Sequence, residues 1–135
     1  MRRKPNLKSR VERCAGFLVA QPKALRGHWQ EEFGCSEIHV ELGCGKGAFT
    51  VETAKRNQNI LIVGLEKITN VLVIALERAE QAQLLNVKFI NGLADDLLDF
   101  FEAGEVSRIY INFCDPWPAN RHSKRRLTGR RLLKL

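Results

Sequence analysis

Three glycines spaced two residues apart, Gly43, Gly45 and Gly47, follow closely on an acidic residue, Glu41. Repeated glycine is typical of a tight turn that lets main chain approach a ligand closely. The pattern G-x-G-x-G lacks the hydroxyl residue that completes a phosphate-binding loop, and it differs from the dinucleotide pattern G-x-G-x-x-G. The glycines therefore predict a binding turn without defining its ligand.

Two carboxylates narrow the choice of ligand. Glu66 lies about twenty residues beyond the glycines and suits the two hydroxyls of a ribose, because a carboxylate can accept both hydrogen bonds. That role would fit NAD and S-adenosylmethionine equally. An acid at Glu41, just before the turn, would repel a pyrophosphate and attract the ammonium and sulfonium groups of S-adenosylmethionine. The charge pattern thus favours the methyl donor.

A second stretch that could do chemistry is Asp115-Pro116-Trp117-Pro118, which is followed by a basic run at 121–126. Each proline fixes φ, so the Asp115 carboxylate would be held in place before a ligand arrives. The alternative is a proline-stiffened turn with no chemical role. Lysines and arginines beside it would contact phosphates. An acidic donor pocket next to a basic rim would suit methylation of a nucleic acid.

The hydrophobic pattern indicates which elements position these residues. Alternating or continuous apolar runs predict strands, and apolar residues at helical spacing predict helices. Strands are predicted at 38–42, 60–65, 87–90 and 107–113, and helices at 48–57, 69–85 and 95–101. Strands that alternate with helices predict an α/β domain with a mainly parallel sheet.

The predicted strands all end in polar segments. These segments are Glu41 with the glycines, Glu66, residues 91–96 and Asp115. Right-handed crossovers bring such ends to one edge of the sheet, where ligands of open parallel sheets bind. The sequence therefore predicts a single rim that carries the site. Before the first strand, residues 1–13 predict a mobile basic arm and residues 13–20 and 28–33 short helices, with Trp29 in the core.

Positive charge gathers at the two ends of the 135-residue chain, in 1–13 and 121–135, while acids outnumber bases between them. Such clustering favours contact with a polyanion, although two solvated tails would look the same. No apolar stretch reaches the roughly 18–20 residues of a membrane span, and no signal peptide pattern opens the chain. We expect a cytoplasmic protein without a membrane partner. Its cysteines, Cys14, Cys35, Cys44 and Cys114, are expected to be free thiols.

Four stretches carry a resemblance to known proteins: E-L-G-C-G-K-G-A-F, V-G-L-E-K, I-N-F-C-D-P-W-P and R-H-S-K-R-R-L-T. Together they are similar to the bacterial tRNA (guanine-N7-)-methyltransferase family, class I enzymes that use S-adenosylmethionine. The resemblance covers nearly the whole chain and implies a Rossmann-like parallel sheet. It divides the chain into a basic arm with short helices at 1–36 and the N-terminal part of a methyltransferase domain at 37–135.

The resemblance also implies a role for each site residue. Asp115 would be the catalytic residue, at the junction of donor and guanine. The donor would be bound by Glu41, Gly43, Gly45, Gly47, Glu66, Leu93, Asp95 and Asp115. Contact with tRNA would fall to Arg121, His122, Ser123, Lys124, Arg125 and Arg126, and Ala119 would adjoin the substrate.

Two positions depart from the family pattern. Leu93 stands where the family has an acid that contacts the adenine side of the donor, so Asp95, Asp96 or a backbone N–H would take that role. Ala119 stands where the family often has the lysine that meets the substrate. Guanine N7 carries a lone pair and no proton, so its methylation needs alignment and electrostatic stabilisation but no general base. Asp115 would accept hydrogen bonds from guanine N–H groups.

The family's sheet has seven strands, and about four are found before Leu135. The resemblance thus implies a C-terminally truncated chain, which we expect to be marginally stable, prone to associate and weak in catalysis. Two other interpretations stay open, an NAD(P)-dependent oxidoreductase domain and a non-catalytic RNA-binding remnant. The sequence does not specify the tRNAs or the oligomeric state. The isolated His28, His39 and His122 predict no metal site.

Overall fold

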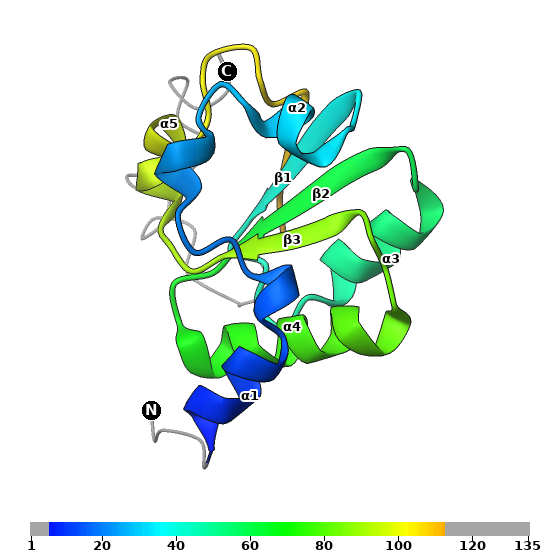
Figure 1. Cartoon of the computed structure of the whole chain (residues 1–135), viewed down its shortest axis with the longest axis vertical. Coiled ribbons are helices and arrows are strands. Elements are labelled where there is room, and N and C mark those ends of the chain that lie inside the picture. The colour runs from blue at the N-terminus through cyan, green and yellow to red at the C-terminus, as the bar shows by residue number, and fades with distance from the viewer. Residues whose placement is uncertain (1–5, 113–135) are drawn as a thin grey trace, which may run out of the picture.

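The computed structural model describes residues 6–112, and within them four parallel strands form one sheet (Figure 1). The order of the strands is β3-β2-β1-β4. Their bounds are Glu37–Leu42 for β1, Ile60–Leu65 for β2, Val87–Ile90 for β3 and Arg108–Ile111 for β4. The prediction of an α/β domain with a parallel sheet is confirmed.

The register aligns the carboxyl ends of the strands. Leu42 of β1 pairs with Leu65 of β2 and with Ile111 of β4, and Leu65 pairs in turn with Ile90 of β3. The chain runs outward from β1 to β2 and β3, then returns to place β4 on the other side of β1. In such sheets the ligand crevice lies outside the strand ends, where the order reverses. Here that point lies between β1 and β4.

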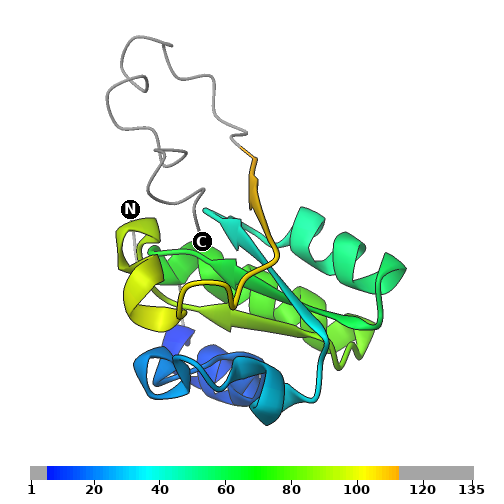
Figure 2. The same ribbon diagram turned by 90° about the horizontal axis from the view of Figure 1, so that it is seen from above.

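Apolar side chains fill both faces of the sheet. On one face Ile38, Val40 and Leu42 pack with Trp29 and Phe101, and that face is covered by α2 (Trp29–Phe33) and α5 (Leu97–Phe100). On the other face α3 (Ala48–Arg56) and α4 (Thr69–Ala82) contribute Val51, Leu72 and Leu76 to a second cluster. Figure 2 shows α3 and the segment around α2 on opposite sides of the sheet. The sheet is thus the middle layer of three.

The predicted elements agree closely with the observed ones in the sheet region. The bounds predicted for β2 and β3 are those observed, and the helix predicted at 48–57 is α3. The helix predicted at 69–85 ends at Ala82, because Gln83 adopts a left-handed conformation with φ of 54°. The segment predicted as one helix at 95–101 is a 3₁₀ turn, Ala94–Asp96, followed by α5.

The N-terminal segment differs from the expectation. The prediction of a mobile arm is wrong for Leu7–Arg13, which form helix α1, and the helix predicted at 13–20 is a 3₁₀ turn at Ala15–Phe17. The reason is tertiary: the Arg10 guanidinium binds the Glu77 carboxylate of α4 through two hydrogen bonds of 2.8 and 2.5 Å. Leu18 then bridges to Phe89 of β3.

Two predictions about side chains are confirmed. Trp29 is fully buried, stacks on Phe101 with ring centroids 4.6 Å apart, and donates its indole N–H to the Phe100 carbonyl oxygen. Among the described residues, Cys14, Cys35 and Cys44 are free thiols, whereas Cys114 lies outside them. Nor does any helix formed by residues 6–112 combine the length and apolar character that crossing a membrane requires.

A buried carboxylate ties the N-terminal segment to the approach to β4. Glu105 accepts backbone N–H bonds from Gly27, Trp29 and Glu102, at distances of 2.9, 3.0 and 2.9 Å. Its side chain thus satisfies donors at the start of α2 and in the turn before β4. Because these three N–H groups from two distant segments all donate to one buried carboxylate, Glu105 holds the segments together.

Replacing Glu105 by alanine should therefore lower the unfolding free energy by about 2–4 kcal/mol, since buried donors are left unsatisfied. Urea denaturation followed by circular dichroism measures the change. Glu102→Ala is the matched control, because Glu102 is exposed in the same turn and its backbone N–H is kept. Equal effects of the two substitutions would contradict this role of Glu105.

Candidate functional site

The glycine turn lies at the carboxyl end of β1, as predicted. Gly43, Gly45 and Gly47 have φ of 65°, 58° and 81°, in the region that favours glycine. The Cys44 N–H donates to the Leu65 carbonyl oxygen at 2.9 Å, which carries the turn across the end of β2. A Cβ atom at Gly47 would lie 2.6 Å from the Cβ of Ala75 in α4. The turn therefore brings the start of α3 into close contact with α4.

Glu66 follows β2 and lies against the glycine turn. Its Oε1 accepts the Gly45 N–H at 3.0 Å, and its Oε2 accepts the Ile68 N–H at 3.2 Å. Each carboxylate oxygen has a second lone pair, so further hydrogen bonds can be accepted. The side chain is partly exposed. This acid and the glycine turn thus lie side by side at the strand ends, as the sequence predicted, while their role in binding stays a prediction.

The segment after β3 runs beside Glu66. The Gly92 N–H donates to the Glu66 carbonyl oxygen at 3.2 Å, and the Asn91 side-chain amide donates to the same oxygen at 2.9 Å. Leu93 is 44 % exposed and Ile68, on the neighbouring loop, is 39 % exposed. The rim therefore presents two large apolar side chains on the loops around Glu66, a combination that suits the faces of a flat aromatic ring.

Asp95 and Asp96, the two acids that could replace the carboxylate missing at position 93, follow Leu93 in the 3₁₀ turn Ala94–Asp96. Asp96 accepts the Leu93 N–H at 3.4 Å, and Asp95 is exposed. The Asp96 carboxylate is thus bound to the backbone of its own turn, whereas the Asp95 side chain faces solvent. Of the two, Asp95 is the more accessible carboxylate.

Glu41 has a different environment from Glu66. It is 2 % exposed, and its carboxylate accepts hydrogen bonds from the Thr50 hydroxyl and, at 3.2 Å, from the Asn112 side-chain amide. Burial raises its pKa, and the two hydrogen bonds oppose that rise. Burial, followed by the charge of Glu41, also raises the pKa of the neighbouring Cys44 thiol. A buried, hydrogen-bonded carboxylate thus stands directly behind the glycine turn.

Sequence reasoning missed Thr50 and Asn112. Thr50 lies three residues into α3 and is fully buried, and Asn112 follows β4 directly. The position of Asn112 at a strand end was a signal that could have found it, whereas a threonine within an amphipathic helix carries none. The predicted residues Asp115, Ala119, Arg121, His122, Ser123, Lys124, Arg125 and Arg126 lie outside the described residues.

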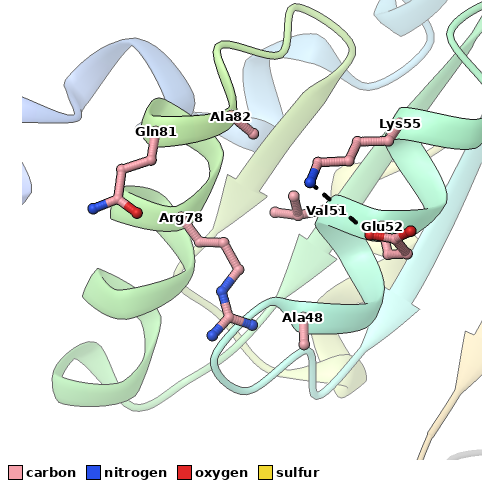
Figure 3. A pocket seen from close by; sticks show the side chains of 7 residues that line it. All are labelled: Ala48, Val51, Glu52, Lys55, Arg78, Gln81 and Ala82. Carbon is pink, nitrogen blue, oxygen red and sulfur yellow. Dashed lines mark ion pairs between the residues drawn. The ribbon is translucent and has the colours of Figure 1, made fainter.

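A separate groove runs between α3 and α4, with a volume of about 420 Å³ (Figure 3). Figure 3 shows the Arg78 side chain extending toward Ala48 and Lys55 pointing toward Glu52, whose carboxylate is 4.0 Å from the lysine nitrogen. The groove is lined by Ala48, Val51, Glu52, Lys55, Arg78, Gln81 and Ala82. No residue of the strand ends lines it, so it is distinct from the rim site.

Each histidine of the described residues, His28 and His39, lies near one carboxylate. His39 Nε2 lies 3.0 Å from Glu37 Oε1, and its Nδ1 lies 3.3 Å from the Tyr110 hydroxyl. His28 lies 3.7 Å from Glu31 on the surface. Residues 6–112 contain no group of three or more His, Cys, Asp or Glu that could hold a metal ion.

The sheet order, the glycine turn after β1 and the acid after β2 define the class of fold, which is a Rossmann-like α/β fold with a parallel sheet. A solved structure described as an antibiotic-related methyltransferase aligns with 70 % of this chain and 48 % of its own, with a TM-score of 0.56 and 23 % identity. Residues 36–135 match the sequence family described as "Putative methyltransferase", and the chain belongs to that family.

Curated relatives extend the comparison. The tRNA (guanine-N(7)-)-methyltransferase of Bacillus cytotoxicus is 44 % identical over 135 residues, which cover 99 % of this chain and 62 % of the relative. The enzyme of the same name from Geobacillus kaustophilus is 46 % identical over 136 residues, with 100 % and 63 % covered. The chain thus spans about three fifths of the length of these relatives.

The contact at Gly47 yields a stability prediction. Gly47→Ala should cost about 1–2 kcal/mol for its left-handed backbone and about 1–3 kcal/mol more for the clash with Ala75. Gly45→Ala is the matched control, because its φ of 58° is similar but a Cβ there meets nothing within 4 Å. Chemical denaturation of both variants measures the difference. Equal losses would show that the close approach to α4 does not constrain the turn.

The buried Glu41 predicts a pH dependence. Because its pKa lies above the ordinary value of 4.5, the folded chain binds its proton more tightly than the unfolded chain does. The contribution of the Glu41 proton to the unfolding free energy is therefore greatest below pH 4.5. This contribution is lost as the pH rises through the folded-state pKa of Glu41. The Glu41→Gln variant has no proton to lose at this position. As the pH rises, its unfolding free energy should therefore increase relative to that of the wild type.

Urea denaturation of both proteins between pH 4 and pH 8 measures this trend. Glu12→Gln serves as control, since Glu12 is an exposed carboxylate of α1. A difference between wild type and Glu41→Gln that is constant over this range would rule out a raised pKa at Glu41.

Proposed function

We propose that this chain forms the donor-binding part of an S-adenosylmethionine-dependent enzyme that methylates guanine N7 in tRNA. The observation that carries the proposal is the Glu66 carboxylate, held against the glycine turn by the Gly45 N–H and still able to accept hydrogen bonds. The names of the curated relatives support the reaction and the tRNA substrate. When bound, S-adenosylmethionine supplies a methyl group bonded to a sulfonium sulfur, which leaves as a neutral thioether.

The described residues fit such a donor. Glu66 would accept hydrogen bonds from the two ribose hydroxyls, and the backbone of Gly43, Gly45 and Gly47 would approach the chain of the methionine part. Ile68 and Leu93 would pack on the adenine ring, and the exposed Asp95 carboxylate would accept a hydrogen bond from its amino group. The negative charge of Glu41 would attract the cationic end of the donor from behind the turn.

The acceptor side of the proposal rests on residues outside the described part. Asp115 would accept hydrogen bonds from guanine N–H groups and stabilise the charge that develops on the purine. The basic run Arg121, His122, Ser123, Lys124, Arg125 and Arg126 would bind tRNA phosphates, with Ala119 next to the substrate. Because N7 has no proton to lose, none of these residues needs to act as a general base.

We propose that residues 1–36 form a basic arm with short helices and that residues 37–135 form part of the methyltransferase domain, a division supported by the family match from residue 36. A tRNA substrate would place the protein in the cytoplasm. The geometry of the rim supports no preference for any oligomeric state.

Calorimetric titration with S-adenosylhomocysteine tests the donor site directly. We expect saturable binding by the wild type and a loss of about ten- to hundredfold in Glu66→Ala, since hydrogen bonds to a charged group are removed. Glu31→Ala is the control, because it deletes a carboxylate that is 86 % exposed on α2. Binding of NADH instead, seen as a change in nicotinamide fluorescence, would contradict the proposal and favour an oxidoreductase.

Transfer of labelled methyl from S-adenosylmethionine to a tRNA transcript tests the reaction, and mild alkaline cleavage then locates the methyl group at N7. Binding of S-adenosylhomocysteine together with tRNA retention but no transfer would favour a non-catalytic RNA-binding role. Methyl transfer to an atom other than guanine N7 would overturn the proposed specificity but would not contradict the proposed donor-binding site.

A further inference from the structure

An asparagine stands at each end of β3, Asn86 before the strand and Asn91 after it. Each uses its side-chain amide to donate to main-chain carbonyl oxygens of neighbouring segments. Asn86 donates to the carbonyl oxygens of Ala54, Asn57 and Ile60, at 2.9, 3.0 and 3.0 Å. That contact lies at the amino end of the sheet, where β2 begins. Asn91 makes the corresponding contact at the carboxyl end, on the rim.

The Asn91 side chain spans the loop between β2 and α4. Its nitrogen donates to the Glu66 carbonyl oxygen at 2.9 Å and to the Lys67 carbonyl oxygen at 3.2 Å. Its oxygen accepts the Thr69 hydroxyl at 3.3 Å. Because an amide nitrogen carries two N–H groups, this loop uses both of them. One exposed side chain thus holds the main chain from the end of β2 to the first residue of α4.

The same loop carries the carboxylate that is proposed to bind the ribose. The Glu66 N–H donates to the Ile90 carbonyl oxygen at 3.1 Å, and the Glu66 carbonyl oxygen accepts from the Gly92 N–H at 3.2 Å and from Asn91. From this fixed main chain the Glu66 side chain reaches the Gly45 N–H. Of these three contacts to the Glu66 main chain, that of Asn91 is the one made by a side chain. A substitution can therefore remove it alone.

We propose that Asn91 is a positioning residue for donor binding, which acts through Glu66 by fixing the main chain from which the carboxylate projects. This inference rests on the proposed function, in which Glu66 accepts hydrogen bonds from the ribose hydroxyls. The role requires no contact between Asn91 and the donor. A small displacement of a hydrogen-bonding group is enough to weaken a bidentate contact, because both bonds depend on its orientation.

The chemistry of the contact makes the role specific to an amide. The two carbonyl oxygens of Glu66 and Lys67 can only accept hydrogen bonds, so the group that faces them must donate. In Asn91→Asp the side chain keeps its shape, but a carboxylate oxygen replaces the donor and repels both carbonyl oxygens. Asn91→Ala removes the contact without adding repulsion. The aspartate variant should therefore displace the Glu66 main chain further than the alanine variant does.

Calorimetric titration with S-adenosylhomocysteine tests this order. We expect Asn91→Ala to weaken binding by about threefold and Asn91→Asp by about tenfold or more. Asn86→Ala is the matched control, because it removes the same kind of contact at the other end of β3, and its affinity should stay within about twofold of wild type. Equal losses in Asn86→Ala and Asn91→Ala would overturn the inference, as would an Asn91→Asp variant that binds like the wild type.

A double-mutant cycle separates action through Glu66 from a general loss of structure. Glu66→Ala deletes the carboxylate and keeps the main-chain contact with Asn91. If Asn91 acts through that carboxylate, Asn91→Asp should weaken binding by less than about threefold in the Glu66→Ala background. A direct contact with the ligand, or a looser fold, predicts the full tenfold loss in both backgrounds. Additive losses would therefore overturn the positioning role.

Amide hydrogen exchange measures the same link without any ligand. The N–H groups of Gly45 and Ile68 donate to the Glu66 carboxylate. Both should exchange faster in Asn91→Asp, because their acceptor is displaced, and at the wild-type rate in Asn86→Ala. Wild-type exchange at both sites in Asn91→Asp would overturn the inference.

Two further outcomes are distinguishable. If Asn86→Ala does not fold, the double-mutant cycle decides without it, and Asn91→Ala replaces Asn91→Asp in the cycle if the aspartate variant does not fold. Failure of the wild type to bind S-adenosylhomocysteine would overturn the proposed function and this inference with it. Normal wild-type binding with additive losses would overturn only the role of Asn91.

Discussion

The close approach of Gly47 to Ala75 is the constraint on which the site depends. A Cβ at Gly47 would lie 2.6 Å from the Cβ of Ala75 and 2.9 Å from its Cα, so only glycine allows the two helices to meet at this distance. The left-handed turn at Gly47 starts α3 at this contact. Its third residue, Thr50, is thereby placed at Glu41, and the preceding glycines cross the end of β2 to reach Glu66.

Two glutamates at neighbouring strand ends show how environment divides the roles of one residue type. Glu66 is partly exposed, is fixed by two backbone N–H groups and keeps lone pairs that can accept further hydrogen bonds. Glu41 is enclosed between β1, α3 and the end of β4, and burial raises its pKa. An accessible carboxylate can accept hydrogen bonds from hydroxyl groups of a ligand, while an enclosed one is bonded to the elements around it. The two neighbouring strand ends thus carry one accessible and one enclosed carboxylate.

Charged residues near the N-terminus take part in packing rather than only in solvation. Arg10 pairs with Glu77, and Lys88 of β3 donates to the Gly16 carbonyl oxygen at 2.7 Å while lying 5.8 and 5.6 Å from the ring centroids of Phe17 and Phe33. Partial burial lowers the pKa of Lys88. These contacts bind residues 7–18 to α4 and β3, which explains why a segment with the composition of a solvated arm is ordered there.

The sequence by itself determined the bounds of β2 and β3, the glycine turn, the place of Glu66 beside it and the burial of Trp29, because periodicity and turn chemistry act over a few residues. The tertiary structure alone decided that Leu7–Arg13 form a helix, that Gln83 ends α4, and that Thr50 and Asn112 meet at Glu41. The helix at Leu7–Arg13 and the meeting at Glu41 depend on partners elsewhere in the chain, Glu77 for Arg10 and Asn112 for Glu41. Local patterns carry no information about such partners, whereas the packed tertiary structure brings them within hydrogen-bonding distance.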